Sequence, residues 1–69
     1  MSERHTIFRV EATYDLTVKV GDRVRQGERL SQNPDPGARS TAPVTGIVRS
    51  IQFDPERHEF VITIAAARS

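Results

Sequence analysis

The sequence contains no cysteine and no tryptophan, and it has only one tyrosine and three phenylalanines. Without cysteine the chain cannot form disulfide bonds or any metal site that needs a thiolate. Ten basic and nine acidic residues leave a formal net charge of +1. This near balance argues against a protein whose main task is to grip a phosphate backbone.

The chain also lacks a long hydrophobic run, because no apolar stretch approaches the roughly 20 residues of a membrane-spanning helix. The first five residues do not have the charged and apolar segments of a secretory signal. We therefore expect a cytoplasmic protein. We expect one domain over residues 1–69, near the lower size limit for independent folding, which favours self-association or docking onto a larger assembly.

Apolar residues alternate with polar ones along most of the chain, and this period of two predicts short β-strands. We expect no helix, since only 22–29 leaves room for about one turn. The expected fold class is all-β, a small barrel or sandwich. The expected strands cover 7–12, 16–20, a short piece from Leu30, 46–53 and 60–65.

The alternation also predicts which side chains face the core. The three phenylalanines are expected on core faces. In the strand over 46–53 the pattern divides the side chains between two faces, with Ile47, Ile51 and Phe53 on one and Val48, Ser50 and Gln52 on the other.

Glycine and proline mark the turns. Gly21 permits a positive φ, Asp22 can bond to nearby backbone N–H groups, and Gly27 allows a second reversal. Pro43 and Gly46 are expected to form a further structural turn at a strand edge. The remaining clear loop covers residues 32–40, and the stretch 54–57 predicts a tight turn capped by its aspartate.

Two of these turn elements together resemble the biotinyl/lipoyl-like barrel-sandwich hybrid superfamily. Residues 20–30 read V-G-D-R-V-R-Q-G-E-R-L and residues 42–48 read A-P-V-T-G-I-V. These are similar to the V-G-D-x-V-x-x-G-x-x-L and A-P-x-x-G-x-V elements of that superfamily, in the same order. The resemblance covers about 16–65 and implies a flattened barrel built from two intertwined halves.

One departure from the superfamily bears directly on function. Carrier members place a lysine for lipoyl or biotin at a hairpin tip between the two elements, which here corresponds to Asp35, Pro36 and Gly37. No lysine stands there, and the only lysine of the chain is Lys19. We therefore expect neither a lipoyl nor a biotin carrier, and no cofactor.

The C-terminal half does not repeat the first glycine element, and this shorter ending is similar to a lysine-free branch of the superfamily. That branch includes the N-terminal module of the C subunit of Rnf electron-transport complexes, and a related module in the A subunit of the sodium-pumping NADH:quinone reductase. The resemblance implies an accessory module. The flavin-, NADH- and iron–sulfur-binding parts of those subunits have no counterpart here.

No residues form a convincing catalytic or metal-binding set. His58 has only His5 as a histidine companion, whereas a metal site needs three or four converging ligands. Asp54 and Glu56 stand in a turn with no apolar pocket to shift a pKa. The glycines lack the spacing of a phosphate-binding loop. We expect no enzyme.

Two kinds of interaction remain. The favoured one is protein docking through a stiff loop, because prolines lower the entropy lost on binding. The partner would be an unknown subunit of a larger complex, and a homodimer is plausible because short strands leave exposed edges. The alternative is a small β-barrel that binds nucleic acid, since nine of the ten basic residues are arginine. The expected contact residues of the loop are Pro34, Asp35, Pro36, Gly37 and Arg39.

Overall fold

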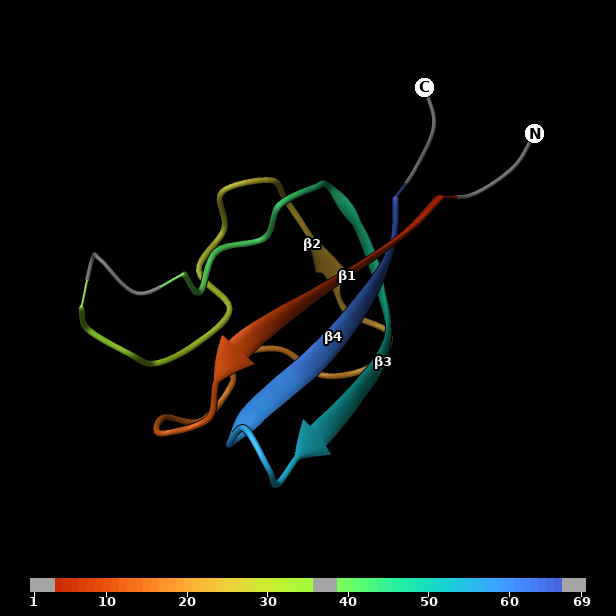
Figure 1. The fold of residues 1–69 in the computed structure, drawn as a ribbon. Coiled ribbons are helices and arrows are strands. Elements are labelled where there is room, and N and C mark those ends of the chain that lie inside the picture. Colours follow the sequence, from red (N-terminus) through yellow and green to blue (C-terminus); the bar gives the residue numbers. More distant parts are fainter. Residues whose placement is uncertain (1–3, 36–38, 67–69) are drawn as a thin grey trace.

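A computed structural model describes residues 4–35 and 39–66. Four strands form one antiparallel sheet in the order β1-β4-β3-β2, and the sheet curls into a half-barrel (Figure 1). No helix occurs within the described ranges, so the all-β prediction is confirmed. The strands are β1 (Arg4–Glu11), β2 (Arg23–Val24), β3 (Gly46–Asp54) and β4 (Glu59–Ala66).

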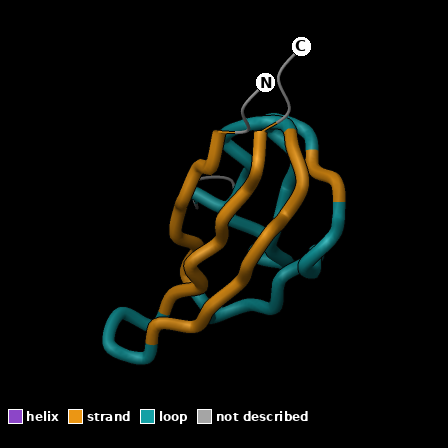
Figure 2. The backbone as a smooth tube through the Cα atoms, turned by 90° about the vertical axis from the view of Figure 1, so that its right-hand side faces the viewer, coloured by secondary structure: helices purple, strands orange, loops and turns teal. Residues whose placement is uncertain are grey.

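Segments without regular strands form a second layer behind the sheet (Figure 2). Isolated bridges join Leu16 to Ser31 and Arg29 to Thr41. The amide of Leu30 donates a hydrogen bond to the carbonyl of Ser40 at 2.8 Å. These few bonds align three chain segments side by side without building a continuous ladder.

The strands predicted over 16–20 and from Leu30 are therefore wrong as regular strands. The first segment turns instead of running straight, because the amide of Asp22 donates to the carbonyl of Lys19 at 3.0 Å. The carboxylate of Asp22 in return accepts the amide of Lys19 at 3.0 Å. This tight turn leaves Val20 58% exposed, and the short β2 that follows it was not predicted.

The strand register brings apolar side chains of β1, β4 and β3 together in rows on the inner face of the sheet. Phe8 pairs with Ile62, which pairs in turn with Ile51. Leu30 from the second layer packs against these rows and is completely buried. The core residues are Val10, Val24, Leu30, Ala42, Val48, Ile62 and Ile64.

A β-bulge overturns the predicted faces of β3. The register shifts between Val48 and Ser50, so that Val48 pairs with Ile64 while Ser50 pairs with Thr63. The extra residue reverses the alternation. Val48 consequently shares the inner face with Ile51, and Ile47 lies on the opposite face.

Phe53 also departs from its predicted burial. It lies on the inner side of the sheet opposite Phe60, but it is 51% exposed because this end of the hairpin extends beyond the second layer. Its ring packs on Phe60 with centroids 5.8 Å apart. The apolar alternation correctly predicted that Phe53 points to the inner face of the sheet. It did not predict that the buried core ends before this residue.

Gly21 and Gly27 lie in turns, whereas Gly46 lies in β3. Gly21 and Gly27 adopt φ angles of 98° and 88°, in the region that disfavours other residues. Gly46 is required for a different reason, since a Cβ there would overlap the carbonyl oxygen of Ala65 in β4. The close approach of β3 and β4 at this point depends on glycine.

We predict that Gly46→Ala lowers the free energy of unfolding by at least about 3 kcal/mol, because the atoms in its way are backbone and cannot rotate aside. Gly21→Ala is the matched control: its Cβ would meet open space, and only the strain of the positive φ remains, about 1–2 kcal/mol. Urea denaturation followed by circular dichroism measures both. Equal losses in the two variants would contradict the steric argument.

Candidate functional site

The candidate contact site is the loop between the two buried serines Ser31 and Ser40, here called the 33–39 loop. Its described part projects from the side of the sheet (Figure 1). Pro34, Asp35 and Arg39 are exposed, as a contact surface requires. The predicted contact residues Pro36 and Gly37 lie outside the described residues.

The first half of the loop is held by a series of side-chain to backbone hydrogen bonds. The buried hydroxyl of Ser31 accepts the amide of Asn33 at 3.1 Å. The side-chain oxygen of Asn33 then accepts the amide of Asp35 at 3.0 Å. Between these two turns Pro34 fixes its own φ. The chain therefore leaves the core in a defined direction.

The base of the loop is closed by backbone bonds. The amide of Leu30 donates to Ser40, and the amide of Gln32 donates to the carbonyl of Asp15 at 2.9 Å. Ser40 is 5% exposed, so both ends of the loop start from buried positions. The sequence predicted the exposed residues of this loop but gave no sign of its two serine anchors.

We predict that Ser31→Ala loosens the loop, because the amide of Asn33 loses its acceptor. The free energy of unfolding should fall by about 1 kcal/mol. Hydrogen exchange of the Asn33 amide should accelerate. Thr41→Ala, at an exposed position on the neighbouring segment, should leave that exchange rate unchanged. An unaltered Asn33 rate in Ser31→Ala would show that the hydroxyl does not hold the loop.

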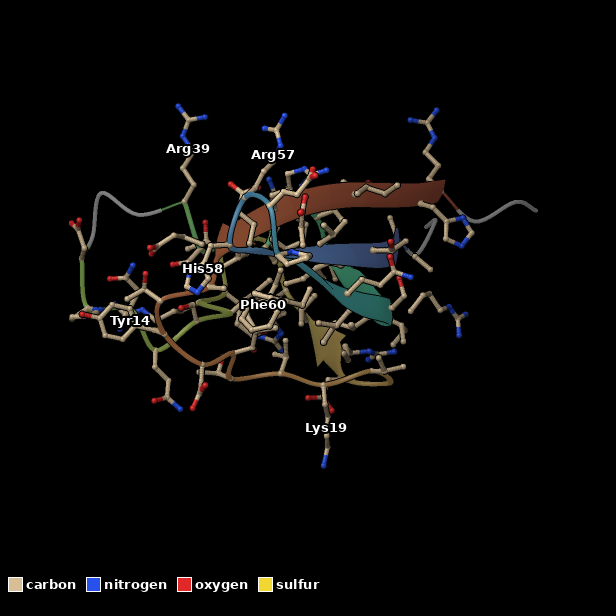
Figure 3. The ribbon with its side chains drawn as sticks, turned by 60° about the horizontal axis from the view of Figure 1, so that its bottom comes forward. Tyr14, Lys19, Arg39, Arg57, His58 and Phe60 are labelled. Atoms are coloured by element: carbon tan, nitrogen blue, oxygen red, sulfur yellow. The ribbon has the colours of Figure 1, made fainter. Side chains whose placement is uncertain are left out.

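A second group of side chains lies at the hairpin between β3 and β4. His58 contacts the ring of Phe53 edge-on, with centroids 5.7 Å apart, and it has a positive φ of 53°. Arg57 and Arg39 extend to the same side of the molecule (Figure 3). This ring cluster was not predicted, although the placement of Phe53 and Phe60 on either side of a turn is a signal that could have revealed it.

Charged groups on the outer face of the sheet form a small ion cluster. The guanidinium of Arg9 lies 3.0 Å from the carboxylate of Asp54 and 3.3 Å from that of Glu59. The hydrogen bond from Arg9 lowers the pKa of Asp54 below its ordinary value of 3.8, and the amides of Arg57 and Glu56 act in the same direction. Asp54 thus serves as an ion-pair partner and turn cap, and the predicted cap is present.

We predict that Asp54→Asn destabilises the protein at neutral pH, since asparagine keeps an acceptor for the turn but loses the charge. A lowered pKa means that the ionised form stabilises the fold above the ordinary pKa. The difference between the two proteins should therefore shrink as the pH falls through and below 3.8. Urea denaturation at several pH values measures it. In an Arg9→Met background the difference should become much smaller, because only the bonds from the amides of Glu56 and Arg57 remain, and an unchanged difference there would exclude the ion pair as the cause.

Lys19 and the 33–39 loop lie in different parts of the molecule. Lys19 follows Val18 in the turn before Gly21, and its side chain points away from the body on the side opposite Arg39 (Figure 3). The described residues contain no group of three or more histidines, aspartates or glutamates that could hold a metal ion. Within those same residues, no helix is long and apolar enough to cross a membrane.

Comparisons with family models, with curated proteins and with solved structures found no match to this chain.

Proposed function

We propose that this chain is a non-enzymatic docking module that binds a protein subunit of a redox or other multi-subunit complex through the 33–39 loop. The observation that carries the proposal is the ordered, exposed exit of this loop from two buried serines. Because these bonds already fix residues 31–35, this part of the loop loses little conformational entropy on binding. Pro34 and Asp35 offer an apolar and an acidic contact, and Arg39 a bidentate donor.

The arrangement of the two motif elements supports the finer proposal of a barrel-sandwich hybrid. The amide of Gly21 donates to the carbonyl of Val48 at 2.8 Å, and the amide of Val48 donates back to Asp22 at 2.9 Å. Gly27 and Ala42 are joined in the same manner, with a 2.8 Å bond from the glycine amide. Each glycine turn of the first element thus bonds to the second element, as two intertwined halves require.

The proposal excludes a carrier role. A swinging-arm carrier needs an amine at the tip of a protruding hairpin, and Lys19 lies in a short turn away from the 33–39 loop. Intact protein from its native cells should therefore have the unmodified mass. A lipoyl or biotinyl addition at Lys19 would overturn this part of the proposal.

We predict that the tagged full chain, expressed at its native level, co-purifies with a flavin or iron–sulfur subunit. Arg39→Glu should weaken binding to that purified subunit at least tenfold, because a central arginine contact is commonly worth more than 1.4 kcal/mol. Arg25→Glu is the matched control at another exposed position and should bind normally. Equal affinity of the Arg39 variant and the wild type would refute docking through this loop.

Exposed rings support the alternative of a nucleic-acid-binding barrel. Tyr14 is 40% exposed and Phe53 51%, and both could stack on bases. Such a protein would bind single-stranded DNA or RNA with an affinity that falls steeply with salt concentration. Absence of salt-dependent binding in a titration would exclude this alternative and leave protein docking.

A further inference from the structure

The outer edge of β1 is unpaired in the described structure. β1 is the first strand in the sheet order, and among the described strands it pairs with β4 alone (Figure 1). Among the described residues no other segment exchanges a backbone hydrogen bond with Arg4–Glu11. The edge therefore presents a row of free N–H and C=O groups.

The direction of each backbone group on β1 follows from the ladder. The amide of Ala12 donates to the carbonyl of His58 at 2.9 Å, which makes this a hydrogen-bonded pair. Bonded and non-bonded pairs alternate in an antiparallel ladder, and the register with β4 is regular. Even-numbered residues of β1 thus bond to β4. The residues whose backbone groups point to the free edge are His5, Ile7, Arg9 and Glu11.

The edge has little of the usual protection against pairing. Natural sheets protect edge strands with charged side chains, lysine above all, with proline or with a bulge. β1 contains no lysine, proline or bulge, and its charged residues are Arg4, Arg9 and Glu11. Its most exposed apolar side chain, Ile7, is 66% exposed. Arg9, the charge nearest the middle of the strand, extends across β4 to Asp54 and does not guard the edge.

We propose that two copies of this chain pair through this edge, with their β1 strands antiparallel about a twofold axis at Phe8. In this register His5 lies opposite the partner's Glu11, and Ile7 lies opposite the partner's Arg9. A continuous sheet then runs through both copies. The proposal does not rest on the docking function, because the 33–39 loop takes no part in it.

Two independent features favour a second copy of the chain as the partner of the β1 edge. The same features select this register of the two strands. It is the one antiparallel self-pairing in which all four outward-pointing residues, His5 to Glu11, find a bonded partner within β1. It also places an acidic side chain opposite a histidine at both ends. A shift by two residues brings Arg9 opposite the partner's Arg9 in one direction and opposite the partner's His5 in the other, and both shifts separate His5 from the partner's Glu11.

In this register, apolar side chains of the two copies also contact each other. Ile7 would pack on the aliphatic stem of the partner's Arg9, whose guanidinium is already held over the sheet. On the inner face the half-buried ring of Phe8 meets the partner's Phe8. Such cross-strand pairs contribute to sheet stability in addition to the backbone bonds.

The test is sedimentation equilibrium of the full chain from micromolar to about millimolar concentration, the range of affinities expected for a small interface. We expect a monomer–dimer equilibrium. Hydrogen exchange should slow with concentration at the amides of Ile7 and Arg9, whereas Phe8 and Val10 should be protected at every concentration. A chain that is monomeric throughout this range would overturn the proposal.

Two kinds of variant test the edge and the register separately. Ile7→Pro removes an outward-pointing N–H that β4 does not use, and it should weaken the dimer at least tenfold. Circular dichroism confirms that it folds. A dimer that tolerates Ile7→Pro in a folded protein uses another surface, which would overturn the proposal.

The charge variants do not alter the backbone, so they remain informative if the proline variant fails to fold. His5→Glu should weaken dimerisation about fivefold, because two Glu–Glu pairs of like charge replace two His–Glu pairs. Adding Glu11→Lys to it should restore the affinity. Glu56→Lys, in the turn between β3 and β4, is the control and should have no effect. Failure of the second substitution to restore the affinity would contradict this register.

Discussion

The structure depends on the burial of β4 between two antiparallel neighbours. β4 pairs along its length with both β1 and β3, and Ile62 and Ile64 on its inner face are completely buried. Full burial of each of these side chains contributes roughly 1.5–3 kcal/mol. In a chain of 69 residues without disulfides, that is a large share of the available stability. The second layer covers this strip and closes the core.

The second layer is held by other interactions than the continuous strand ladders of the sheet. Its segments exchange only isolated bridges and a few backbone bonds, and two positive-φ glycines set the directions in which they leave the sheet. Leu30 and Ala42 fix the layer on the core. Because Ser31 and Ser40 are buried in the same layer, the packing of the core also determines where the 33–39 loop emerges. The described ends of this loop are thus held by the core.

The two proposed surfaces, the 33–39 loop and the β1 edge, would bind through different chemical groups. The 33–39 loop offers side chains on a backbone whose polar groups are already satisfied at its start, at Asn33 and Asp35. The β1 edge offers the backbone groups themselves. A small β protein can therefore hold a partner by side-chain contacts while pairing with its own copy by strand addition. The two proposed surfaces lie on separate elements, so a protein partner and a second copy of the chain could bind at the same time.

The sequence by itself determined the strand character of β1, β3 and β4, the glycine turns, the aspartate cap at Asp54 and the exposed loop. These follow from local alternation and from backbone preferences that need no distant partner. Only the tertiary structure decided the bulge beside Val48, the loss of regular strands at 16–20 and the serine anchors of the loop. Each depends on which segment lies opposite, and a bulge reverses faces without any change in the local pattern.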